Sequence, residues 1–173
     1  MKKVNLRPLT EGAMIAAVYA VLTLFFWQFS SMQIQVRISE AMCILPLFTY
    51  AAVPGLTAGC FLINLIMGNP WDAVFGSLAT FLAALMTYLL GKIGKKWAYA
   101  IAPMAPVLFN AMIIPPVLYF GYGITAFGNT VGLWSVLGFQ ALSIAIGEII
   151  ACYGMGIPLY LLIKRTKLFK QSR

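Results

Sequence analysis

The stretch Gly91-Lys92-Ile93-Gly94-Lys95-Lys96 interrupts an otherwise apolar chain of 173 residues, and it decides the fold. The other basic residues gather at the two ends of the chain, with the exception of Arg37. Hydrophobic residues make up 62% of the chain and charged residues 9%, and the mean hydropathy is +0.91. A soluble domain of this length cannot bury so much apolar surface, so we expect an all-α integral membrane protein. Lys and Arg are retained on the cytoplasmic side of short loops, so the three basic clusters mark one membrane face.

Six apolar segments are candidates for membrane-spanning helices, namely about 11–29, 40–53, 55–68, 72–91, 97–120 and 132–163. If all three basic clusters are cytoplasmic, the number of spans between consecutive clusters must be even. The counts of four and two satisfy this condition. The sequence therefore predicts one domain, residues 1–173, that is a bundle of six transmembrane helices with both termini in the cytoplasm.

Prolines decide how several of these segments are divided. The second and third segments are short, and Ala52-Val53-Pro54-Gly55 is predicted to form the turn between them. The alternative is one long helix kinked at Pro54, which would break the even count. The fifth segment is predicted to be bent or interrupted, because it contains Pro103, Pro106, Pro115 and Pro116. The sixth is longer than a bilayer requires, so part of it is expected outside the membrane.

Four acidic residues are present, and three of them suggest a function. Glu11 lies beside the basic N-terminus, which is a plausible partner for it. Glu40 and Asp72 open the second and fourth segments, where an acid can simply interact with the positive end of the helix dipole. Glu148 lies roughly 24 Å along the last segment. An ionisable group at that depth is either functional or held by a structural hydrogen bond to another helix.

Further polar residues within the apolar segments complete a candidate binding set. Asn and Gln at such positions are ordinarily explained by hydrogen bonds between helices. Together, however, the polar groups predict a pocket that opens to the outer side. The candidate substrate-binding residues are Arg37, Glu40, Asn64, Asp72, Asn110, Gln140 and Glu148. No chain of titratable groups reaches the inner face, which argues against a proton pump or an ion channel.

Several other classes of function are disfavoured. The chain has no histidine, and its cysteines, Cys43, Cys60 and Cys152, lack the spacing of a metal site and are expected to be free and buried. An intramembrane enzyme would depend on a pair of carboxylates, so no catalytic residue and no metal is predicted. The basic residues flank apolar spans and do not form a stripe with aromatic residues, so nucleic acid is not an expected partner.

Small residues recur on the first segment at a spacing of four. Ala13 and Ala17 form one such pair, and Ala16 and Ala20 form another. This spacing lets two transmembrane helices approach closely. The contact could be made within the bundle or with another subunit.

The stretch Gln35-Val36-Arg37-Ile38-Ser39-Glu40-Ala41 closely resembles the QueT family. The resemblance continues over all six segments. It includes Leu45-Pro46, Pro54-Gly55-Leu56, Gly59-Cys60, Asn64-Leu65, Asp72, Gly76-Ser77, Thr80, Asn110-Ala111, Gly147-Glu148 and Gly156-Ile157-Pro158-Leu159.

This resemblance implies a substrate-binding S-component of an energy-coupling factor (ECF) transporter in a bacterial cell membrane. Such components have six helices and cytoplasmic termini, and they work with a transmembrane coupling protein and two ATPases. Ala13 and Ala17 match the surface that contacts the coupling protein. The chain has no GxxxxGK[ST] loop, so no cofactor is expected on it, and ATP would be used by the partners.

The family also implies a substrate. QueT members are associated with queuosine precursors such as 7-aminomethyl-7-deazaguanine, whose cationic aminomethyl group and guanine edge both suit carboxylates. Among Glu40, Asp72 and Glu148, one is expected to pair with the ammonium group and another with the guanine edge. A cobalamin-type corrinoid is the alternative substrate. A stand-alone facilitator or channel and a purely structural membrane subunit are the alternative functions.

Overall fold

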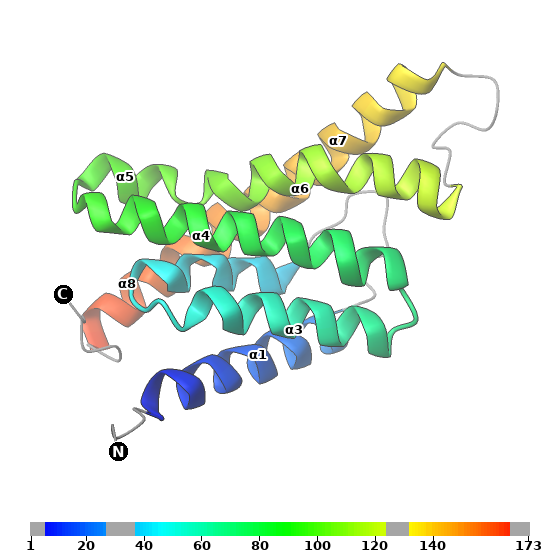
Figure 1. Ribbon diagram of the computed structural model, residues 1–173. Coiled ribbons are helices and arrows are strands. Elements are labelled where there is room, and N and C mark those ends of the chain that lie inside the picture. Colours follow the sequence, from blue (N-terminus) through cyan, green and yellow to red (C-terminus); the bar gives the residue numbers. More distant parts are fainter. Residues whose placement is uncertain (1–5, 27–36, 124–131, 167–173) are drawn as a thin grey trace.

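The computed structural model describes residues 6–26, 37–123 and 132–166, and within these ranges it contains helices and no β-strand (Figure 1). The all-α prediction is thus confirmed. In chain order the elements are α1 (Arg7–Phe25), η1 (Ile38–Leu47), α3 (Ala52–Ile66), η2 (Asp72–Gly76), α4 (Ser77–Ile93), α5 (Lys96–Ile101), α6 (Met104–Pro116), η3 (Val117–Gly121), α7 (Leu133–Ile149), η5 (Ile150–Gly156) and α8 (Ile157–Thr166).

Several of these elements join end to end into longer helices. Among the described residues, four helices are long and apolar enough to cross a membrane, namely Arg7–Phe25, Asp72–Ile93, Lys96–Gly121 and Leu133–Thr166. The other two are shorter. The ten-residue η1 is a 3₁₀ helix about 20 Å long, and α3 is about 22 Å long. Neither reaches the roughly 30 Å of a bilayer core by itself.

The second and third predicted segments form two separate helices that run in opposite directions (Figure 1). The alternative of one helix kinked at Pro54 is therefore wrong. The predicted position of the turn is wrong as well, because the chain reverses over residues 48–51 and α3 already begins at Ala52. Pro54 lies in the first turn of α3, where a missing N–H removes no helical hydrogen bond.

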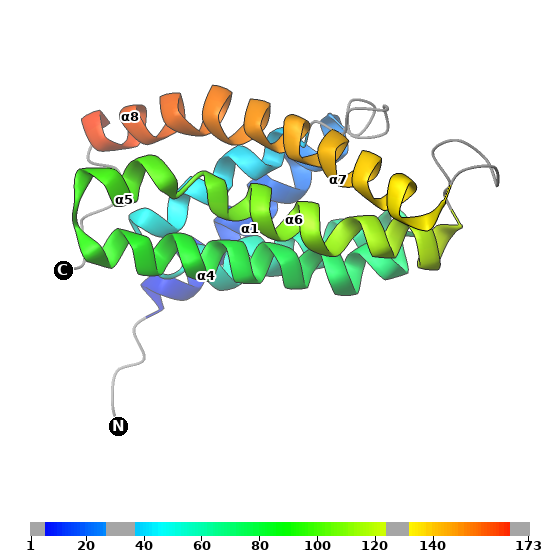
Figure 2. The ribbon, with the colours of Figure 1, turned by 90° about the horizontal axis from the view of Figure 1, so that it is seen from above.

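The fifth segment is interrupted as predicted. Its short first part, α5, ends at Ile101, and α6 begins after Pro103. Pro115 and Pro116 are followed by a π-helical stretch, η3. The sixth segment is one helical run from Leu133 to Thr166 (Figure 2). Its first turns project beyond the other helices in the view of Figure 1.

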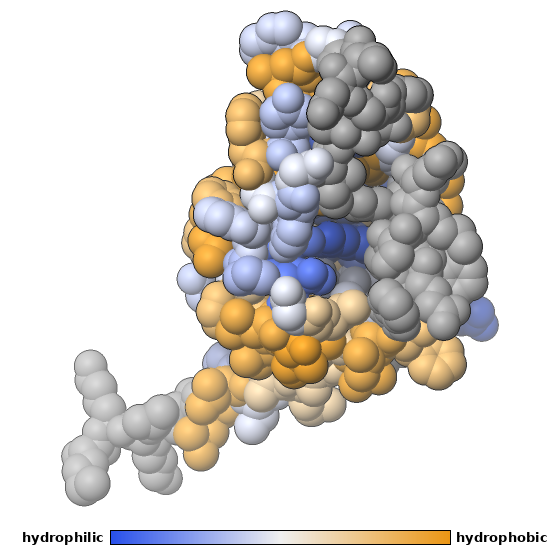
Figure 3. All heavy atoms as spheres, turned by 90° about the vertical axis from the view of Figure 1, so that its right-hand side faces the viewer, coloured by the Kyte–Doolittle hydropathy of each residue, from blue (hydrophilic) through white to orange (hydrophobic). Residues whose placement is uncertain are grey.

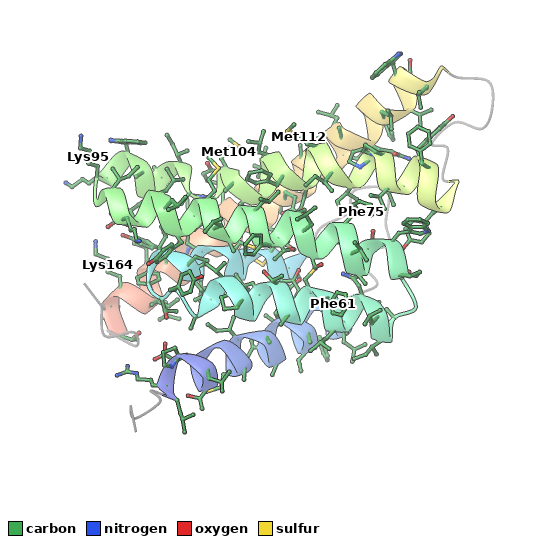
Figure 4. The ribbon with its side chains drawn as sticks, viewed as in Figure 1. Phe61, Phe75, Lys95, Met104, Met112 and Lys164 are labelled. Carbon is green, nitrogen blue, oxygen red and sulfur yellow. The ribbon has the colours of Figure 1, made fainter. Side chains whose placement is uncertain are left out.

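The described basic residues other than Arg37 lie at one end of the bundle, called here the basic end. Arg7 at the start of α1, the turn between α4 and α5, and the last turn of α8 all lie there (Figure 1). Lys95 and Lys164 are labelled at this end in Figure 4. Five further cations, Lys2, Lys3, Lys167, Lys170 and Arg173, lie outside the described residues. The chain that leaves the basic end after one basic cluster thus returns to the same end at the next cluster.

Helices α1 and α3 pack very closely, because glycines face small residues across their contact. A Cβ atom added to Gly55 would lie 2.7 Å from the carbonyl oxygen of Gly12, and one added to Gly59 would lie 2.8 Å from that of Ala16. Ala20 also packs against the hydrophobic core. Ala13 and Ala17 are exposed on the other side of α1. The two small-residue pairs therefore differ. Ala16 and Ala20 pack inside the bundle, whereas Ala13 and Ala17 face outward.

Candidate functional site

The first part of the site is an ion pair at the end of the bundle opposite the basic end. Arg37 immediately precedes η1, and Asp72 opens the helix that continues into α4. Arg37 Nη2 donates a hydrogen bond of 3.3 Å to Asp72 Oδ2, and the two side chains are 17% and 10% exposed. The other carboxylate oxygen, Asp72 Oδ1, is buried and has no hydrogen-bond partner within the described part of the chain. It is an acceptor that a ligand could use.

Neighbouring groups hold Asp72 in place. Asn64 Nδ2 donates to the carbonyl oxygen of Cys60 at 2.9 Å and approaches that of Asp72 at 3.5 Å. The backbone N–H of Asp72 points to the hydroxyl of Tyr122 at 3.4 Å, so the end of η3 reaches the start of η2. Hydrophilic residues are visible in the middle of this face of the molecule, among apolar ones (Figure 3).

Glu40 forms a second, deeper part of the polar cluster. It is 1% exposed, and both carboxylate oxygens have protein partners. The Tyr19 hydroxyl donates to Oε1 at 2.6 Å, and the Cys43 thiol donates to Oε2 at 2.9 Å. The adjacent Ser39 makes a 2.8 Å hydrogen bond with Thr23 of α1. Helix α1 is therefore tied to η1 by two side-chain hydrogen bonds.

Glu148 lies close to Glu40 and also has partners at both oxygens. Asn110 Nδ2 of α6 donates to Oε1 at 2.7 Å, and the Cys152 thiol lies 3.6 Å from Oε2. The same thiol lies 3.6 Å from the carbonyl oxygen of Glu40, so Cys152 connects the two glutamates. The structural hydrogen bond that the sequence offered as the alternative explanation for Glu148 is thus present.

The carboxyl groups outnumber the cations in this region. Within the described residues, the cation Arg37 contacts Asp72. Glu40 and Glu148 are hydrogen-bonded to uncharged side chains instead. The gap between Glu40, Cys152 and Pro106 has no room for a water molecule. Among the described residues, Asp72 is the one of these three acids with a carboxylate oxygen that has no protein partner.

The sequence-predicted residues are thus placed in two neighbouring groups. Arg37, Asn64 and Asp72 lie together at the outer part of the site, while Glu40, Asn110 and Glu148 form the deeper part. Gln140 is buried on α7, two turns before Glu148. Whether these residues contact a substrate is still a prediction.

Three residues of the cluster were not predicted as site residues, namely Tyr19, Cys43 and Cys152. The two cysteines were expected to be free and buried, and they are. Their positions three residues after Glu40 and four after Glu148 could have indicated a shared helix face. No local signal could have paired Tyr19 with Glu40. The predicted partner of Glu11 is confirmed, because Arg7 Nε lies 2.8 Å from its carboxylate.

In residues 6–26, 37–123 and 132–166, no three His, Cys, Asp or Glu side chains are placed to hold a metal ion.

Comparison with known proteins identifies the family. The model of the QueT transporter family matches residues 9–165. A search among curated proteins and one among solved structures found no significant match. Since the family model covers most of the chain, including every residue of the polar cluster, the protein belongs to the QueT transporter family.

Proposed function

We propose that this protein is the substrate-binding S-component of an ECF importer and that it captures a queuosine precursor, such as 7-aminomethyl-7-deazaguanine. The family is one of transporters, and the fold is a bundle of apolar helices with a polar cluster at one end. In this proposal the basic end faces the cytoplasm of a bacterium, all six helical segments belong to the membrane domain, and the polar cluster opens to the exterior.

The unpartnered oxygen of Asp72 carries the substrate assignment. A buried carboxylate oxygen without a partner costs free energy, so a ligand that donates to it would be favoured. The aminomethyl group of the deazaguanine is cationic and could donate to this oxygen.

The arrangement of donors and acceptors suggests how the ligand would lie. Asp72 would accept from the ammonium group or from the paired N–H groups of the guanine edge. Arg37, already beside Asp72, would donate to the ring carbonyl, and Asn64 would supply a further polar contact. Glu40 and Glu148 would exchange their present hydrogen-bond partners for polar groups of the ligand.

Transport would require other subunits. We propose that a transmembrane coupling protein and two ATPases complete the importer and that ATP is used by those ATPases. Ala13 and Ala17 are small and exposed on α1, so a helix of the coupling protein could approach closely there.

The substrate proposal is tested by ligand identification and binding. The detergent-purified protein from cells grown in rich medium should release a compound with the ultraviolet spectrum and mass of a deazapurine. Titration should give saturable binding of 7-aminomethyl-7-deazaguanine and much weaker binding of the 7-cyano analogue, which lacks the ammonium group. Release of a red corrinoid, or equal binding of both bases, would contradict the assignment.

The transport proposal needs a separate measurement. Vesicles that contain this chain alone should not accumulate the substrate, whereas vesicles with the coupling protein and both ATPases should do so when ATP is supplied. Uptake by the chain alone would instead indicate a stand-alone facilitator.

A further inference from the structure

A polar cavity lies at the basic end, away from the proposed substrate site. Its volume is about 490 Å³, and its wall comes from the turn after η1, the last turns of α4 and the start of α5. Lys92 and the hydroxyl-bearing residues Thr49, Tyr50, Tyr88 and Tyr99 contribute its polar lining. Pro46, Leu47 and Phe48 form an apolar wall. The cavity is therefore amphipathic.

The cation at this cavity is held in a defined place. The ammonium group of Lys92 lies 4.7 Å from the centre of the Tyr88 ring, and Tyr88 packs edge-on against Tyr50 with ring centres 5.1 Å apart. Gly91 allows α4 to approach the end of η1 closely, since a Cβ atom there would lie 3.2 Å from Leu47 Cα. Among the described residues, the hydroxyls of Tyr50, Tyr88 and Tyr99 make no hydrogen bond. The cavity is thus lined by hydroxyl groups that can donate hydrogen bonds and by the positive charge of Lys92.

The charge around the cavity is positive. No acidic residue lies among the described residues that line it. Glu11 contacts the wall of the cavity, because it accepts a hydrogen bond from Thr49, and it is already paired with Arg7. Lys95 and Lys96 follow Lys92 where α4 joins α5, and Lys164 lies at the same end of the bundle (Figure 4). These surroundings favour an anionic ligand.

We propose that this cavity binds the phosphate group of an anionic phospholipid, with Lys92 as its counter-ion. A phosphate takes donors from Lys92 and from the tyrosine hydroxyls, whereas the apolar wall suits the glycerol and the first methylene groups of the lipid. The cavity lies at the level of the basic clusters, where a membrane protein meets the headgroups. Inorganic phosphate shares the same chemistry but would leave the apolar wall without a partner.

The test measures lipid retention by the full chain with native mass spectrometry in a mild detergent. Phosphatidylglycerol and phosphatidylcholine with identical acyl chains are offered at equal concentration. We expect phosphatidylglycerol to be retained about fivefold more, since one basic residue near an anionic headgroup contributes about that factor. Lys92→Gln should abolish the preference, and Lys92→Arg should keep it. The matched control Lys95→Gln, which removes the same charge where α4 joins α5 but not from the cavity, should change retention by less than about twofold.

Two further measurements make the result decisive. Tyr88→Phe removes a hydroxyl while keeping the ring beneath Lys92, so it should weaken phosphatidylglycerol retention without unfolding the protein. Thermal unfolding and substrate binding should be unchanged in all variants, because the substrate site lies at the other end. Equal retention of both lipids, or equal losses in Lys92→Gln and Lys95→Gln, would overturn the proposal. Displacement of the lipid by millimolar inorganic phosphate would assign the cavity to free phosphate and overturn the lipid assignment.

Discussion

The hydroxyl of Tyr19 donates a 2.6 Å hydrogen bond to Glu40 Oε1, and this bond joins α1 to the segment that carries Arg37. Both side chains are about 1% exposed. Thr23 and Ser39 form a second hydrogen bond between the same elements. The helix that presents Ala13 and Ala17 outward is thus connected to the polar cluster through buried polar contacts. A displacement of α1 is therefore expected to affect the polar cluster, and a displacement of the cluster is expected to affect α1.

Changing Tyr19 to Phe should destabilise the protein. The substitution keeps the ring but leaves one oxygen of buried Glu40 without its donor, and a hydrogen bond to a charged group contributes about 1.5–3 kcal/mol. Chemical unfolding in detergent should show a loss of that size. In the control Tyr153→Phe, the lost bond is at the surface, to Ala100, and the change should stay below about 0.5 kcal/mol. Equal effects of the two variants would show that Glu40 does not depend on Tyr19.

Changing Gly55 to Ala should also destabilise the fold, through the contact between α1 and α3. The added Cβ atom would lie 2.7 Å from a backbone oxygen of Gly12, so the helices must separate. Overpacking of this kind costs about 1–3 kcal/mol. In the control Gly138→Ala on α7 no atom lies within 4 Å of the new Cβ, and alanine's better helix propensity should leave stability unchanged or slightly higher. A neutral Gly55→Ala variant would mean that the close approach is not required.

The course of the bundle could be predicted from hydropathy and from the places where charge and proline interrupt it. The break at Pro103 followed because a proline inside a helix removes a backbone hydrogen bond. The turn near Pro54 was predicted too late in the chain, and a proline is again the reason. Proline is equally suited to a turn and to the first turn of a helix, and the sequence does not distinguish the two.

The candidate site was predictable only in its residue types. An acid in an apolar segment is conspicuous, so Glu148 could be found without a structure. The partners of Glu148 were harder to predict, because Asn110 lies on another helix and the contact between the two depends on how the helices pack. The bond between Tyr19 and Glu40 joins residues on different elements, and no spacing rule reveals such a contact.

Changing Asp72 to Asn should weaken substrate binding. The variant removes the charge that pairs with Arg37 and replaces the buried, unpartnered oxygen or its neighbour with an amide. Loss of one charge-assisted hydrogen bond corresponds to a fall in affinity of about tenfold to a hundredfold for 7-aminomethyl-7-deazaguanine. Isothermal titration of the purified protein measures it. Glu11→Gln removes an acid from the basic end and should leave affinity unchanged. Unaltered affinity in Asp72→Asn would remove Asp72 from the site.

Changing Ala17 to Trp should interfere with partner binding while leaving the fold intact. Ala17 is exposed on α1 beside Ala13, so a large side chain there meets no other residue of the bundle. A coupling protein that packs closely on this face would be displaced, and co-purification with it should fall by about tenfold or more. Substrate binding by the isolated chain should not change, because the buried face of α1 with Tyr19 is untouched. Leu142→Trp is the control, because it places an equally large ring on an exposed position of α7. If both variants reduce co-purification equally, the coupling protein does not bind specifically at the Ala13 and Ala17 face. If neither does, that face contacts lipid.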